Sequence, residues 1–176
     1  MGRSFGYATL LVFGFFLTFI MKMEAGDMGT LKIASPAFKL NELIPVKHTC
    51  DGPDVNPLIE IEGVPANAKS LALIVDDPDA PRGLWVHWLV WNIDPATKQI
   101  KENTVPQGAF QGMNDFRKQH YGGPCPPSGT HRYFFKLYAL DTTLTLRQDA
   151  SKPMLENAMK GHVLAQAELV GLYKRR

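Results

Sequence analysis

Short apolar runs, separated by proline, glycine, aspartate and asparagine, make up most of the chain after residue 28. The run Leu58–Gly63 alternates apolar residues with glutamate, and Ser70–Asp77 holds a continuous apolar stretch. Alternation indicates a strand with one buried face, whereas a short continuous run fits a strand buried on both faces. Further runs of this kind lie at 31–35, 84–94, 131–141 and 162–173. The pattern predicts an all-β sandwich or barrel.

Two segments depart from the strand pattern. Near the C-terminus, Ser151 suits the N-cap of a helix and Gly161 suits its end. Between them stand a first-turn proline and an apolar stripe at helical spacing, formed by Pro153, Met154, Leu155, Ala158 and Met159. Residues 102–130 show no regular period, and their glycines, prolines and aromatics predict an ordered, packed loop. Irregular loops of this length are commonly functional or disordered.

An apolar segment over residues 7–21 stands apart from these runs, with Arg3 before it and Lys22 after it. A basic residue followed by a short apolar run is typical of a secretory signal. The residues after the segment make a poor cleavage site, so an uncleaved anchor is the alternative, although a spanning helix wants about 20 residues. We expect residues 1–26 to be a signal peptide or N-terminal anchor, and the protein to be exported, either periplasmic or secreted. If Met28 is the true start, the protein is cytoplasmic.

The composition fits one packed domain over residues 28–176. Of 176 residues, 45% are hydrophobic and 20% charged, which suits a folded chain. The net charge is +2, and basic residues cluster only at the last three positions. This charge pattern excludes a nucleic-acid partner from the expectations. Membrane contact is expected only through the N-terminal segment, where that segment is retained.

The two cysteines, Cys50 and Cys125, sit in no CxxC arrangement, so a structural zinc site is not expected. In an oxidising compartment they would form a disulfide, and in a reducing one they would remain two thiols.

Polar side chains stand at the ends of three predicted strands. Acids fill the turn Asp76–Pro81, His87 lies within a tryptophan-rich run, and His131 and Tyr133 share one face of a strand that turns Arg132 the other way. Taken singly, these are a strand-capping turn, a core histidine and a strand-end histidine beside a core tyrosine. Taken together, two aspartates, two histidines and a tyrosine can line one pocket.

Strand alternation also assigns faces around His87. It places His87 with Trp85, Leu89 and Trp91, and it places the intervening residues Val86, Trp88 and Val90 on the opposite face.

The chemistry that such a pocket supports is narrowed by missing motifs. The chain has no GxSxG, no HxxxH and no GxGxxG or P-loop. Cys125 as a nucleophile with His131 as its base remains open. Binding of a small anion by imidazole and polar groups fits best, with no catalytic residue, no metal ligand and no cofactor expected.

Three separated segments resemble one known family. They are "DDPDAP…VHWLVWNI", "NDFRKQHYGGPCPPSGTHRYFFKLYALD" and "AMKGHVLAQAELVGLY". In this order they are similar to the phosphatidylethanolamine-binding proteins, and most of all to the prokaryotic branch called Raf kinase inhibitor-like proteins. The resemblance runs from about Leu31 to Tyr173. It implies an antiparallel β-sandwich of a large and a small sheet, with one or two short helices.

The resemblance also implies a non-enzymatic protein whose pocket binds a small anionic or phosphorylated ligand. Carried over position by position, the ligand-binding residues are Asp77, Asp79, His87, His131 and Tyr133, with a wall formed by Gly123, Pro124, Pro126 and Pro127. Alternatives remain: an inhibitor of a protease, a kinase or another protein that acts through surface loops, and a metal-dependent phosphohydrolase.

The chain departs from the family pattern at three positions. His48 stands where the family has tyrosine, and Arg117 and His120 stand where it has glycine. Arg117 and His120 either add positive charge beside the pocket or face solvent.

Overall fold

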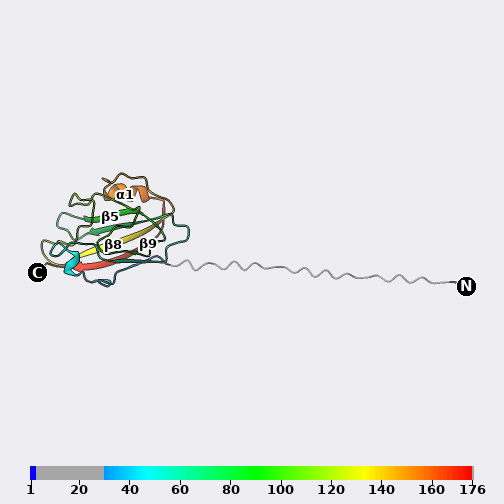
Figure 1. Ribbon diagram of the computed structural model, residues 1–176, viewed down its shortest axis with the longest axis horizontal. Helices are drawn as coiled ribbons and strands as arrows, with labels where there is room; N and C mark the ends of the chain where they lie inside the picture. The colour runs from blue at the N-terminus through cyan, green and yellow to red at the C-terminus, as the bar shows by residue number, and fades with distance from the viewer. Residues whose placement is uncertain (3–29, 176) are drawn as a thin grey trace.

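The structure is a computed structural model that describes residues 1–2 and 30–175. The described chain forms two β-sheets, one α-helix and one short 3-10 helix (Figure 1). The small sheet has the order β1-β3-β6, with β1 at Lys32–Ala34, β3 at Ile59–Glu62 and β6 at Gln99–Ile100. The large sheet has the order β2-β9-β8-β4-β5-β7, formed by β2 (Glu42–Leu43), β9 (Val163–Tyr173), β8 (His131–Leu140), β4 (Ser70–Asp77), β5 (Trp85–Ile93) and β7 (Phe110–Gln111).

Both faces of the large sheet are covered. One buried cluster joins it to the small sheet, with Ile33, Ile61 and Ile100 from the small sheet and Leu73 and Phe135 from the large one. A second cluster lies between the opposite face and the helix α1 (Lys152–Met159), which Figure 1 shows along one side of the strands. Strand β4 is therefore buried at every position, which explains its continuous apolar run.

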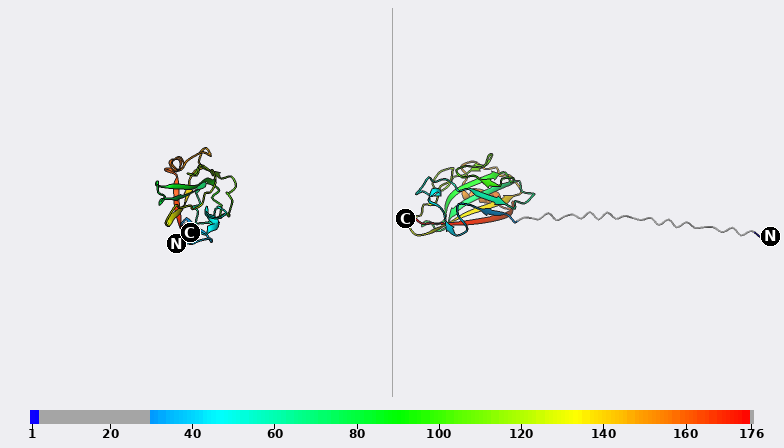
Figure 2. Two further views of the ribbon diagram at one scale, coloured as in Figure 1. Left: turned by 90° about the vertical axis from the view of Figure 1, so that its left-hand side faces the viewer. Right: turned by 60° about the horizontal axis from the view of Figure 1, so that its bottom comes forward.

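The prediction of a large and a small sheet with few helices is confirmed. The predicted antiparallel arrangement is confirmed in part: the other strand pairs are antiparallel, but β2 pairs with β9 in parallel. Strand β2 has only two residues, which is too short for a hydrophobic pattern in the sequence to predict it. It is followed by the 3-10 helix η1 (Val46–His48), which lies near the C-terminal end of β9 in the views of Figures 1 and 2.

The predicted helix begins and ends close to where the sequence placed it. Ser151 is its N-cap by position, although its side chain makes no capping hydrogen bond. Gly161 follows the helix with a φ of 82°, a left-handed conformation that glycine adopts without strain.

A β-bulge overturns the faces predicted around His87. Val75 pairs with Trp88 and Asp76 pairs with Val86, so His87 is the extra residue in β5. Beyond a bulge the alternation shifts by one residue. Val86 accordingly joins Leu89 and Trp91 in the helix-side cluster, while His87 turns toward Tyr133.

The predicted signal peptide or anchor over residues 1–26 lies, apart from its first two residues, outside the part of the chain that the structure describes. Within residues 1–2 and 30–175, no helix has both the length and the apolar character needed to cross a membrane.

Candidate functional site

A cavity of about 330 Å³ opens where one strand ends and two others begin. Because β4 runs antiparallel to both β5 and β8, the end of β4 meets the starts of its two neighbours. This topology brings the "DPDAP", "VHW" and "HRY" segments together, although they lie far apart along the chain. The cavity is lined by Asp77, Ala80, Pro81, Arg82, Trp85, His87, Phe116, Cys125, Pro126, Pro127 and His131.

The three aspartates around the end of β4 each take a different basic partner from β8. Asp76 accepts hydrogen bonds from Lys136 Nζ at 2.8 and 3.0 Å. Asp77 Oδ2 accepts one from His131 Nδ1 at 2.7 Å, and Asp79 accepts two from the Arg132 guanidinium at 2.7 and 2.9 Å. Only the Asp77–His131 pair lines the cavity.

His87 lies at the cavity with its ring orientation fixed by the backbone. It is 2% exposed, and its Nδ1–H donates to the Gly122 carbonyl at 2.6 Å. Burial lowers the pKa of His87, while the bond to Gly122 and the Asp77 carboxylate oppose that change. The neutral ring with hydrogen on Nδ1 keeps Nε2 as a free acceptor.

Tyr133 adjoins the lining residue His87, with its ring edge-on to that side chain at a centroid distance of 5.2 Å. Its hydroxyl oxygen is buried and has no hydrogen-bond partner of normal geometry in the described chain. Burial, with a smaller contribution from the Asp77 carboxylate, raises the pKa of Tyr133 far above its usual range. The hydroxyl is therefore protonated and lies near the Asp77 carboxylate and the Cys125 backbone, without a hydrogen bond of normal geometry to either. The indole N–H of Trp85 is unpartnered in the same way.

A disulfide ties down the wall that the sequence predicted from glycine and proline. Cys50 and Cys125 are bonded, so the bridged alternative is confirmed. The Cys50 amide also donates to the Pro124 carbonyl at 3.1 Å, and the Gly123 amide donates to Asp54 Oδ1 at 2.6 Å. A Cβ atom at Gly123 would overlap Asp54 and backbone atoms of the neighbouring loop, which explains the glycine there.

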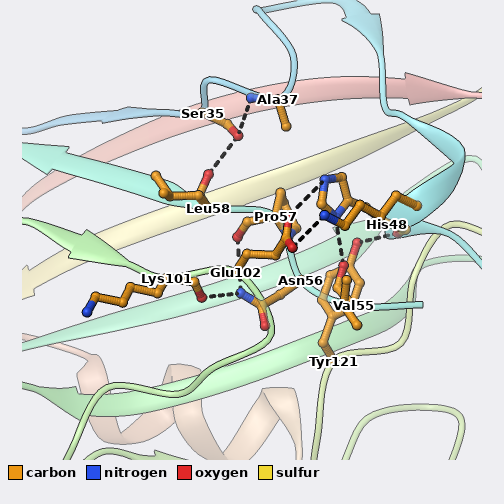
Figure 3. Close-up of polar contacts among 11 residues, drawn as sticks. Ser35, Ala37, His48, Val55, Asn56, Pro57, Leu58, Lys101, Glu102 and Tyr121 are labelled. Atoms are coloured by element: carbon orange, nitrogen blue, oxygen red, sulfur yellow. Dashed lines mark hydrogen bonds and ion pairs between the residues drawn. The ribbon is translucent and has the colours of Figure 1, made fainter. Parts of the chain in front are cut away.

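Behind this wall lies a second set of polar contacts around His48 (Figure 3). His48 is buried, and its Nδ1–H donates to the Val55 carbonyl at 2.9 Å. The Tyr121 hydroxyl donates to the His48 carbonyl at 2.9 Å, and the His48 Nε2 atom lies 4.0 Å from Glu102 Oε2. This histidine, a departure from the family pattern, therefore supports the loop that carries Cys50 and does not line the cavity.

The other two departures are exposed and do not line the cavity either. Arg117 has a φ of 60°, in the left-handed region that favours glycine, which accounts for the glycine expected there.

The sequence-predicted residues divide between the lining and its support. Asp77, His87, Pro126 and His131 line the cavity, as does Pro127. Asp79 is held by Arg132 instead, and its pKa falls to about 2 because of that bond. The remaining predicted residues, which do not reach the lining, are Gly123, Pro124 and Tyr133.

Sequence reasoning missed several lining residues. Trp85 lines the cavity, and the only signals for it in the sequence are its large side chain and its position two residues before His87. Phe116 lies in the irregular loop, where no period assigns it a direction. The turn between β4 and β5 contributes three more lining residues that were not predicted: Ala80, Pro81 and Arg82.

Among the residues that the structure describes, no three His, Cys, Asp or Glu side chains group in a way that could hold a metal ion.

Comparison with known proteins gives a consistent set of relatives. Residues 34–174 match the family described as phosphatidylethanolamine-binding protein. A UPF0098 protein of Pyrococcus horikoshii is 53% identical over 156 residues, which cover 84% of this chain and 78% of the relative. A UPF0098 protein of Methanothermobacter thermautotrophicus is 50% identical over 150 residues, covering 82% of this chain and 99% of the relative.

Two solved structures share the fold. A phosphatidylethanolamine-binding protein homologue from Chlamydia trachomatis matches with a TM-score of 0.81 and 40% identity, over 84% of this chain and 99% of that one. The Escherichia coli protein YbcL, described as a member of the mammalian family of these proteins, matches with a TM-score of 0.78 and 31% identity, over 83% of this chain and 99% of that one.

Proposed function

Because this chain belongs to the phosphatidylethanolamine-binding protein family, we propose that it is a non-enzymatic binding protein whose cavity takes a small acidic ligand, such as a phosphorylated head group. The ligand would lie against His87 and His131, with the Tyr133 hydroxyl beside them.

The buried Tyr133 hydroxyl, which makes no hydrogen bond of normal geometry with any residue that the structure describes, carries this proposal. A buried donor without an acceptor costs about 1–3 kcal/mol, so it is a rare feature of a folded protein. An oxyanion supplies several acceptor atoms in a small volume, and hydrogen bonds to charged acceptors are the strong ones. The indole N–H of the lining residue Trp85 also has no hydrogen-bond partner among the described residues.

The tautomer of His87 favours a ligand whose acidic group carries a proton that it can donate. Its Nδ1–H is used by the Gly122 carbonyl, so Nε2 accepts and does not donate. A phosphate monoester with one P–OH group offers both the acceptors that Tyr133 needs and a donor for His87.

The disulfide weakens the alternative in which Cys125 is a catalytic nucleophile. Its sulfur is bonded to Cys50, so it is not available as a nucleophile for His131 to activate. The disulfide also supports the proposal that the protein works in an oxidising compartment outside the cytoplasm. Fractionation of cells that make the full chain would place it, and a protein found only in the cytoplasm would contradict this part.

Calorimetry tests the binding proposal, with phosphoethanolamine and inorganic phosphate titrated into the wild type and into His131→Ala. We expect saturable binding to the wild type that the variant weakens. Absence of heat up to millimolar ligand would refute it. An inhibitor that works through surface loops would instead act on its target protein equally well with and without His131.

A further inference from the structure

We propose that the preferred ligand carries a compact apolar group, such as an aromatic ring, next to its acidic group, and that Trp85, Phe116 and Pro127 bind that apolar group. This inference rests on the proposed function, because it assigns the part of the cavity that the acidic group leaves open.

The chemistry of the lining is the first argument. The polar lining residues are Asp77, Arg82, His87 and His131, of which Asp77 and His131 are joined by a hydrogen bond. The rest of the wall is mostly apolar and is formed by Ala80, Pro81, Trp85, Phe116, Pro126 and Pro127. Water that occupies such a wall is displaced favourably by an apolar group, at roughly 25 cal/mol per Å² buried. A bare phosphate ion gains nothing from that surface.

The size of the cavity is the second argument. Its volume of about 330 Å³ is at the lower end of the range of cavities that hold drug-sized molecules, roughly 300–1,000 Å³. Inorganic phosphate would leave most of this space to water, whereas a phosphate monoester with one ring would occupy much of it.

The rigidity of the apolar wall is the third argument. Phe116 packs edge-on against Trp85 and against His87, at centroid distances of 5.4 and 5.3 Å and interplanar angles of 74° and 71°. Pro126 and Pro127 directly follow Cys125, which is fixed by its disulfide. A preformed wall binds without a large ordering cost.

Substitution of Arg82 is an internal control, because its guanidinium interacts with the charge of a ligand and not with the apolar group. It lines the cavity, is exposed, and forms no ion pair with any other residue that the structure describes. Its guanidinium attracts any anion that enters, so Arg82→Gln should weaken acidic ligands of both kinds by a similar factor.

Phenyl phosphate and phosphoethanolamine, titrated calorimetrically at one pH and ionic strength, test the inference. Both are phosphate monoesters, but only the first carries a ring. We expect phenyl phosphate to bind the wild type about tenfold more tightly or better, a difference of about 1.4 kcal/mol. Phe116→Ala should lower the affinity for phenyl phosphate by a larger factor than the affinity for phosphoethanolamine, and so remove most of that preference.

Phe110→Ala is the matched control. Phe110 is an exposed aromatic of β7 that stacks on Trp91 and lies outside the lining, so its removal should keep the preference. Pro127→Ser, at an exposed lining position, is a second test if Phe116→Ala does not fold. Equal affinities for the two monoesters in the wild type would overturn the inference and leave the proposed function standing. A failure of both to bind would overturn the proposed function as well.

Discussion

His131 Nδ1 lies 2.7 Å from Asp77 Oδ2, and the two residues are 7% and 3% exposed. The pair joins the end of β4 to the start of β8 and lines the cavity. A carboxylate that accepts from one ring nitrogen of a histidine fixes the orientation of the ring. In the proposed function, Asp77 acts on the ligand through His131, as a positioning residue.

Asp77→Ala should destabilise the protein by roughly 2–4 kcal/mol, because it leaves a buried imidazole without its partner. It should also weaken the binding of phosphate monoesters, and Asp77→Asn should do both to a smaller extent. Urea unfolding measures the first effect and calorimetry the second. Wild-type stability in Asp77→Ala would show that the pair contributes little to the fold.

Tyr133→Phe should separate binding from stability. Removal of a buried hydroxyl that makes no hydrogen bond of normal geometry within the described chain should leave the unliganded protein as stable as the wild type, or more stable. The same change should weaken phosphate monoesters about tenfold, because a donor to a charged acceptor is lost. Thermal unfolding without ligand and calorimetry with ligand give the two results. If the variant loses stability and keeps its affinity, the hydroxyl serves the fold and not the ligand.

Loss of the disulfide should reduce stability and loosen the cavity wall together. The bond joins residues 75 positions apart, and removal of such a bond typically costs about 2–5 kcal/mol. In the double variant Cys50→Ala, Cys125→Ala we expect a loss in this range and weaker ligand binding. Dithiothreitol should reproduce both effects in the wild type and change nothing in the double variant. A stable double variant with full affinity would contradict the role assigned to the bond.

Asp79→Asn should affect stability only above acidic pH. The Arg132 guanidinium lowers the pKa of Asp79 from 3.8 to about 2 in the folded protein. A lowered pKa stabilises the folded state above the unfolded value, and that stabilisation is lost as pH falls from about 4 to about 2. The effect is small because Arg132 is more than half exposed. Melting temperatures from pH 2 to pH 7 should converge between variant and wild type at the acid end. A constant difference over this range would show that the ion pair is not its cause.

The long elements of the fold follow from the hydrophobic pattern alone. The run Ser70–Asp77 becomes β4 with the same bounds, because its length and composition allow only a strand buried on both faces. The two-residue strands could not be found, because two residues have no period; they owe their existence to neighbours such as β9, which pairs with Glu42–Leu43.

The polar core of the site was predictable, and its partners were not. Asp77, His87 and His131 meet because antiparallel strands bring their segments to one edge. The bulge at His87 is a property of strand pairing and leaves no mark on β5 itself. Asp79 was assigned to the pocket because nothing in the sequence shows that Arg132, on the outward face of β8, takes it instead.

The central claim is that the cavity binds an acidic ligand through the donors buried around it. A crystal structure of the wild-type protein grown with phosphoethanolamine tests this claim most directly. We predict a phosphoryl group beside His87 and His131, with one oxygen at hydrogen-bond distance from the Tyr133 hydroxyl. An empty cavity at saturating ligand, or a phosphoryl group bound elsewhere with the Tyr133 hydroxyl still unpartnered, would contradict it.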